Sequence, residues 1–166
     1  MKSALAPRPR HTVRGKQVTI LVAEFHPALS RGLVSAATEV LRSSGVAASA
    51  IRLVRVPGAF ELPVVAAKIA SGKRAPDAVV ALGVLIRGQT PQYEVLAHAV
   101  ADGLSQVSVQ TGVPVAFGVI VADTVAQAKA RAVWPARRGR RRPAVENRGA
   151  EAARAAVAVL RLFESI

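Results

Sequence analysis

A chain of 166 residues that is 51% hydrophobic is long and apolar enough for one packed domain, which argues against disorder throughout. It contains no cysteine, which excludes disulfide bonds, thiolate catalysis and cysteine-ligated zinc. The net charge of +13 falls mainly in two segments without acids, residues 1–16 and 137–142, which is typical of solvated appendages and sometimes of polyanion contacts.

The rest of the chain alternates between two hydrophobic patterns. Short apolar, β-branched runs predict strands, and apolar residues spaced three or four apart predict helices. The expected elements are a strand at 17–23, a helix at 28–43, a strand at 49–56, a helix at 59–71, a strand at 77–86, a helix at 91–111, a strand at 113–121, a helix from 123 or 124 to about 134, and a helix at about 147–164. Thr90 is expected to cap the third helix, with Pro91 as its first residue.

This order predicts an α/β fold of three layers, in which helices cover both faces of an open, flavodoxin-like parallel sheet. We expect a flexible basic arm at 1–16, because its prolines interrupt any helix, and a single domain at 17–166 with a basic inserted loop at about 135–146. Ligands of such sheets bind beyond the carboxyl ends of the strands. That rule selects Phe25, residues 57–61, residues 84–90 and Phe117.

Two of these segments have residues suited to particular ligands. Residues 87–91 join a strand to a helix N-terminus, where free N–H groups and the helix dipole attract an anion, and Arg131 can close over a phosphate. Phe60 can lie on a planar ring while Glu61 pairs with polar groups of that ring. The alternatives are an ordinary capped helix at 87–91 and, at 60–61, an aromatic core anchor beside an acid of the first helical turn.

Four motifs then occur in a specific order: VPGAFELP at 56–63, ALGVLIRGQTP at 81–91, TGVPVAFGVIVADT at 111–124 and NRGAEAA at 147–153. With them the chain resembles the 6,7-dimethyl-8-ribityllumazine synthase family over about residues 17–164. That family acts in riboflavin biosynthesis. It condenses 5-amino-6-(D-ribitylamino)uracil with 3,4-dihydroxy-2-butanone 4-phosphate through an imine, loss of phosphate and ring closure.

The resemblance implies no metal or organic cofactor. It implies a homo-oligomer, either a pentamer or a sixty-subunit icosahedral shell, with pockets between neighbouring subunits. It also implies a role for each matching residue. Phe25 would stack on the pyrimidine; Ala59, Phe60 and Glu61 would hold the pyrimidine and ribityl chain; Val84, Leu85 and Ile86 would form the next binding strand end; Phe117 would contact substrate; and Gln89, Thr90 and Arg131 would bind phosphate.

The chain departs from the family at its proton-relay histidine, which is replaced by Gln92. Glutamine has no useful pKa near neutrality, and acid–base help is worth about 10²–10⁴-fold, so we expect a weakened enzyme that still orients its substrates. His26, beside Phe25, is a candidate substitute. His98 lies six residues beyond Gln92 and is turned away from it on the helix. Arg148 replaces the family's lysine in the last motif.

Three functions stay open from the sequence. The first is an active synthase, and the second is a catalytically impaired paralogue that binds lumazine- or flavin-like ligands or builds an assembly. The third is a shell that packages nucleic acid through residues 137–142, although stacking aromatics are absent there beyond Trp134. We expect small-molecule partners, no membrane contact and a cytoplasmic location, because no segment has the length of a secretory or membrane-spanning run.

Overall fold

Four parallel strands form the middle layer of the fold, in the order β2-β1-β3-β4. They are β1 (Val18–Ala23), β2 (Ile51–Val56), β3 (Ala78–Ile86) and β4 (Val115–Ala122). The computed structural model describes residues 13–133 and 146–166. Because the chain turns from β2 on one side of β1 to β3 on the other, the strand order reverses beside β1, and a crevice forms at the carboxyl ends of β1 and β3.

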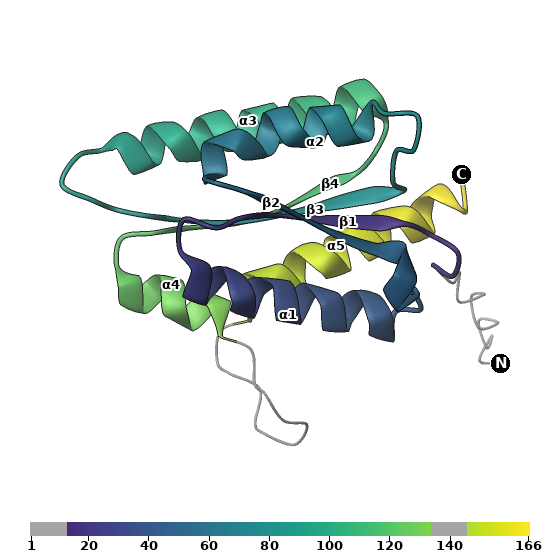
Figure 1. Cartoon of the computed structure of the whole chain (residues 1–166), viewed down its shortest axis with the longest axis horizontal. Helices are drawn as coiled ribbons and strands as arrows, with labels where there is room; N and C mark the ends of the chain where they lie inside the picture. The colour runs from purple at the N-terminus through teal and green to yellow at the C-terminus, as the bar shows by residue number, and fades with distance from the viewer. Residues whose placement is uncertain (1–12, 134–145) are drawn as a thin grey trace, which may run out of the picture.

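Helices cover both faces of this sheet, which confirms the three-layer, flavodoxin-like α/β fold predicted from the sequence (Figure 1). One face carries α1 (Pro27–Ser43), α4 (Val125–Ala132) and α5 (Arg148–Phe163). The other carries α2 (Leu62–Ala70) and α3 (Gln92–Thr111). Two short 3₁₀ turns, Ala48–Ala50 and Ala59–Glu61, precede β2 and α2.

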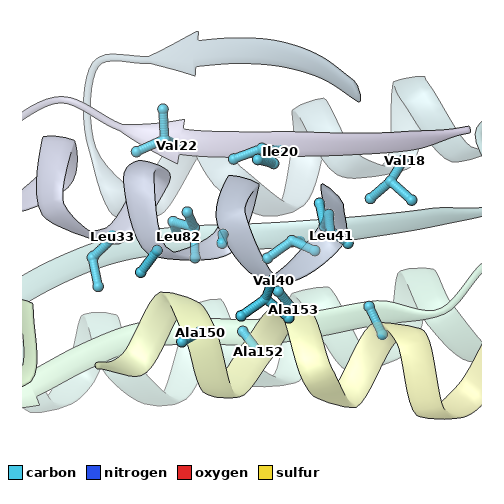
Figure 2. Close-up of a cluster of buried hydrophobic side chains, with 14 of the residues drawn as sticks. Val18, Ile20, Val22, Leu33, Val40, Leu41, Leu82, Ala150, Ala152 and Ala153 are labelled. Carbon is cyan, nitrogen blue, oxygen red and sulfur yellow. The ribbon is translucent and has the colours of Figure 1, made fainter. Parts of the chain in front are cut away.

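The central strand β1 is buried along its whole length, as expected for a strand with neighbours on both edges and helices on both faces. Its side chains alternate between two cores. Val18, Ile20 and Val22 pack towards α1 and α5, where Figure 2 shows them above Leu41 and the alanines of α5. Leu21 and Ala23 pack in the core beneath α2 and α3. A continuous apolar run in the sequence therefore supplies both faces of the sheet.

Helices α1 and α5 pack at very close range. A Cβ atom at Gly149 would overlap the backbone carbonyl of Leu33, and a Cβ atom at Gly32 would overlap the carbonyl of Ala132 at the end of α4. Most of the other buried residues of α5 are alanines, including Ala150 and Ala153. Small residues on these helices therefore let the backbones of α1, α4 and α5 approach one another directly.

Asn147 locks this three-helix layer together from a position that is 1% exposed. Its Oδ1 accepts hydrogen bonds from the N–H groups of Gly149 at 2.8 Å and Ala150 at 3.3 Å, which caps α5. Its Nδ2 donates to the carbonyls of Ala132 at 2.8 Å and Val133 at 3.1 Å. One carboxamide thus provides hydrogen-bond partners for N–H groups at the start of α5 and for carbonyl groups at the end of α4.

Helices α3 and α4 each have one boundary that differs from the sequence prediction. Helix α3 begins at Gln92 with Pro91 as its N-cap, so the assignment of Thr90 as cap and Pro91 as first helical residue is wrong. Helix α4 ends at Ala132, where its C-cap Val133 is extended, and Trp134 lies outside the described residues. The start of α4 agrees with the prediction of 123 or 124. Its N-cap is Thr124, whose side chain accepts a hydrogen bond from the Gln127 N–H.

The first described residues are packed against the domain. Val13 is fully buried, and Lys16 pairs with Glu164 at 2.6 Å and with Asp77 at 3.7 Å. The sequence assigned residues 13–16 to the flexible arm, because the acids that hold Lys16 are far away in the chain and cannot be recognised as its partners. Residues 1–12 and 134–145, including most of the predicted basic loop and Arg segment, lie outside the described residues.

Replacing Asn147 with alanine should cost about 2–4 kcal/mol in the free energy of unfolding, because it removes a helix cap and leaves one buried and one partly buried carbonyl without their donor. Thr124→Ala is the matched control. It removes a cap at an exposed helix start and should cost only about 1 kcal/mol. Chemical denaturation of both variants measures the difference, and equal losses would mean that the Nδ2 contacts of Asn147 add nothing.

Candidate functional site

A pocket of about 330 Å³ opens at the carboxyl ends of the strands, on the side of the sheet covered by α2 and α3. Its walls come from the end of β1, the 3₁₀ turn before α2, the end of β3 and the first turns of α3. Ten residues selected from the sequence line it together: Phe25, His26, Ala59, Phe60, Glu61, Val84, Leu85, Ile86, Thr90 and Gln92. Residues that the strand-end rule selected therefore lie together around one pocket.

Two phenylalanines stand in the mouth of this pocket with most of their surface exposed, Phe25 at 75% and Phe60 at 60%. The alternative interpretation of Phe60 as a core anchor is therefore wrong. His26 meets the Phe25 ring edge-to-face, with 5.1 Å between ring centroids, which fixes the orientation of both rings. Exposed aromatic faces above an apolar strand end are the features that a planar heterocycle requires from its site.

The Glu61 carboxylate lies at the wall of the same pocket, beside Gly58. A Cβ atom at position 58 would lie 2.9 Å from Glu61 Oε2, so glycine is the residue that leaves room for the carboxylate there. Glu61 is half-buried, and it follows Phe60 directly in the 3₁₀ turn. The turn thus presents an aromatic face and a carboxylate to the same pocket.

The opposite wall is the exposed loop between β3 and α3, residues 87–91. The N-cap of α3, Pro91, makes no side-chain hydrogen bond, so the alternative of an ordinary capped helix is wrong. The N-terminus of a 20-residue helix is left with backbone N–H groups that no cap side chain satisfies. Together with the helix dipole, these groups favour an anion beside Thr90 and Gly88.

The residue at the relay position, Gln92, is the first residue of α3 and lines the pocket, as does His26. Sequence reasoning missed two further lining residues, Tyr93 and Leu96. Helical spacing could have found Leu96, because residues four apart share a helix face and Gln92 was already selected. Tyr93 carried no comparable signal.

Three selected residues do not line this pocket. Gln89 is exposed on the loop between two residues that do. Phe117 is the third residue of β4 and pairs with Ala81, five residues before the pair of Ile86 with Ala122. Five strand residues span about 16 Å, so placing Phe117 at a carboxyl end was wrong.

The third residue, Arg131, lies in the last turn of α4, on the other face of the sheet. Its Nη2 donates to Glu151 Oε2 at 2.7 Å, and Arg148 Nη1 donates to the same oxygen at 3.0 Å. Two guanidinium groups share one carboxylate, so the partly buried cluster keeps a net positive charge. It can therefore receive an anion brought by another molecule.

Other site chemistries find no support in residues 13–133 and 146–166. This part of the chain contains no group of three or more histidine, aspartate or glutamate side chains that could hold a metal ion. Across the same residues, each helix is too short or too polar to span a bilayer. The features that remain are the aromatic mouth, the uncapped α3 N-terminus and the separate arginine cluster.

Known proteins match the chain along most of its length. The family model described as 6,7-dimethyl-8-ribityllumazine synthase matches residues 15–164. The 6,7-dimethyl-8-ribityllumazine synthase of Renibacterium salmoninarum is 45% identical over 140 residues, which cover 84% of this chain and 85% of the relative. That of Kineococcus radiotolerans is 47% identical over 143 residues, covering 86% and 82%. That of Desulfotalea psychrophila is 40% identical over 152 residues, covering 92% of both chains.

Truncating Phe60 to alanine should separate binding from stability. Because the ring is mostly exposed, we expect the free energy of unfolding to change by less than about 0.5 kcal/mol. A planar pteridine should bind roughly tenfold more weakly or worse, since stacking on an aromatic side chain is worth about 1–3 kcal/mol. Fluorescence titration gives the affinity. Val95→Ala, an exposed apolar residue of α3 outside the pocket, is the matched control and should leave binding unchanged.

Proposed function

The chain belongs to the 6,7-dimethyl-8-ribityllumazine synthase family, and from that membership we propose how its pocket is used. Its activity is that of a transferase of riboflavin biosynthesis, which forms 6,7-dimethyl-8-ribityllumazine. In the proposed arrangement, 5-amino-6-(D-ribitylamino)uracil lies against Phe25 and Phe60 while Glu61 accepts hydrogen bonds from it. The phosphate of 3,4-dihydroxy-2-butanone 4-phosphate lies at Gln89 and Thr90, before α3.

One observation carries this arrangement: a single pocket joins two exposed phenylalanines to an uncapped helix N-terminus. A planar, uncharged heterocycle fits the first wall, and a phosphate fits the second. Holding both reactants in one apolar pocket makes the amine and the ketone neighbours before an imine forms. Effective molarities for well-oriented partners reach about 10⁵–10⁸ M, so orientation alone supplies much of the rate.

Proton transfer is the step for which the proposed site is weakest. Gln92 holds the relay position and can donate and accept hydrogen bonds, but it cannot take up a proton near neutrality. His26 lines the same pocket and carries an imidazole, the side chain that most often serves as a general base, so it is the proposed substitute base. In the proposed reaction, the phosphate group and water accept and donate the remaining protons during ring closure.

The pocket is also proposed to need a second subunit. Family membership implies an oligomer, and we propose a homopentamer in which Phe117 and Arg131 of one subunit face the pocket of its neighbour. In support, both residues lie away from the pocket of their own chain, and the Arg131 cluster retains a net positive charge. Closed rings of this kind use head-to-tail interfaces, which bring two different surfaces together.

The alternatives of an impaired paralogue and of a nucleic-acid shell gain no support. The nucleic-acid shell depends on residues 137–142, which lie outside the described residues. The impaired paralogue depends on Gln92 abolishing turnover, which the following measurement decides.

The natural protein should form lumazine from the two substrates well above the uncatalysed condensation, because orientation and phosphate binding remain. Gln92→His should raise kcat by about 10²–10⁴-fold if it restores the full relay, and by less if His26 already acts. Absorbance of the product gives both rates. Background turnover in both proteins would refute the synthase assignment.

His26→Ala distinguishes the two sources of the proton. In the natural background it should lower kcat about tenfold or more if His26 is the base, and the same change should matter little beside Gln92→His. Unchanged turnover in the natural background would eliminate His26 from the mechanism.

Mixing two impaired variants, assayed at a substrate concentration where each alone has little activity, tests the shared pocket. Phe60→Ala and Arg131→Ala damage opposite halves, so random co-assembly at equal amounts should give intact halves at about one quarter of the pockets, half times half. Activity should recover to about that fraction. A mixture of Phe60→Ala with Phe25→Ala is the control and should recover nothing, because both changes damage the same half. No recovery in the first mixture would place the whole site within one chain.

A further inference from the structure

Tyr93 is the second residue of α3 and lines the pocket. Its hydroxyl makes a polar contact with a residue outside the pocket. Its hydroxyl lies 3.1 Å from Asp123 Oδ1, at the end of β4, and 3.0 Å from Glu94 Oε1 on its own helix. Both carboxylates can accept the single phenolic proton. The contact with Asp123 joins residues that are thirty positions apart. It therefore connects the first turn of α3 to a different strand.

Asp123 is a fixed point for such a connection. Its backbone N–H donates to Gln127 Oε1 at 2.8 Å, while the Gln127 N–H donates to the capping oxygen of Thr124 at 3.1 Å. This reciprocal pair at the start of α4 holds the backbone of Asp123 in place. Its carboxylate also lies 3.8 Å from Arg87 Nη1, so it faces both ends of the loop between β3 and α3.

The loop itself has few other restraints. Residues 87–91 are exposed, and the N-cap of α3 makes no side-chain hydrogen bond. The Arg87 N–H donates to the carbonyl of Ala122 at 2.9 Å, which fixes the start of the loop. At its other end, the Tyr93 hydroxyl makes the side-chain contact to the neighbouring strand end.

We propose that Tyr93 is a positioning residue for the reaction: its hydroxyl, held by Asp123, sets the position of the loop 87–91 that the phosphate-bearing substrate requires. This inference rests on the proposed function, because it takes the loop as the phosphate site. Tyr93 lines the pocket and acts on the substrate through the loop, so its effect falls on binding of the phosphate-bearing substrate.

The phenol keeps its proton over the working pH range. Desolvation and the carboxylates of Glu94 and Asp123 raise the pKa of Tyr93 above its ordinary value. Arg87 is the cation beside the Asp123 carboxylate, with its Nη1 3.8 Å from Oδ1. A protonated phenol can donate to Asp123 throughout, whereas a phenolate would be repelled by both acids. The contact is therefore insensitive to pH near neutrality.

The test compares Tyr93→Phe, Asp123→Ala and the double variant, with Asp102→Ala as the matched control for loss of an exposed acid on α3. Tyr93→Phe and Asp123→Ala should each raise the KM for dihydroxybutanone phosphate about two- to fivefold, the range of exposed polar pairs. The double variant should be no worse than Asp123→Ala alone, because the contact that Tyr93→Phe removes is already absent there. The KM for the pyrimidine and kcat should stay within twofold, and Asp102→Ala should match the natural protein.

A spectroscopic signature reports the contact independently of activity. The chain has one tyrosine, so tyrosinate absorbance titrates Tyr93 alone. Asp123→Asn removes a negative charge that favours the neutral phenol, so the pKa of Tyr93 should fall towards its ordinary value, and Asp102→Asn should leave it unchanged.

Additive KM effects, or an unchanged KM in Tyr93→Phe, would overturn the inference while leaving the synthase assignment intact. If the natural protein forms no lumazine, the proposed function fails. Calorimetric affinity for inorganic phosphate then replaces the KM, and an affinity that Tyr93→Phe leaves unchanged overturns the inference as well.

Discussion

The buried carboxamide of Asn147 is the contact on which one whole layer of the fold depends. It caps α5, holds the end of α4 and lies where glycines let the backbones of α1, α4 and α5 meet. Because α5 begins at this clamp, the Glu151 carboxylate of its first turn reaches Arg131 of α4 and also pairs with Arg148. A contact that looks purely structural therefore also fixes the arginine cluster that is proposed to serve a neighbouring subunit.

Much of the fold could be predicted because its elements differ strongly in pattern. The continuous apolar runs of β1 and β3 are recognisable in the sequence, as is the helical spacing of α1. The helix ends could not be predicted as well. Thr90 has the chemistry of a cap, but the chain turns into α3 only after Pro91, so local preference yields to the path from β3. The packing of Val13 and the ion pairs of Lys16 depend on residues far away in the sequence, which no local pattern reveals.

The candidate site, like the fold, could be predicted from the sequence only in part. Residues at the ends of β1, β2 and β3 could be selected because parallel strands bring their carboxyl ends to one edge. Phe117 was misplaced by the same rule, because it lies early in its strand. The contact between Tyr93 and Asp123 could not be predicted at all, since it depends on the side-chain reach between two elements rather than on either sequence segment. Roles that need a second subunit lie beyond any single chain's pattern.

The hydrogen bonds of Asn147 to Ala132 and Val133 hold together the two described segments that flank residues 134–145 in the sequence. The entropy of closing a loop grows only with the logarithm of its length, so doubling a segment between fixed ends costs about 0.6 kcal/mol. Insertions at this junction should therefore be tolerated. Evolution can lengthen the chain there, or a protein engineer can graft a peptide, without altering how the helices meet.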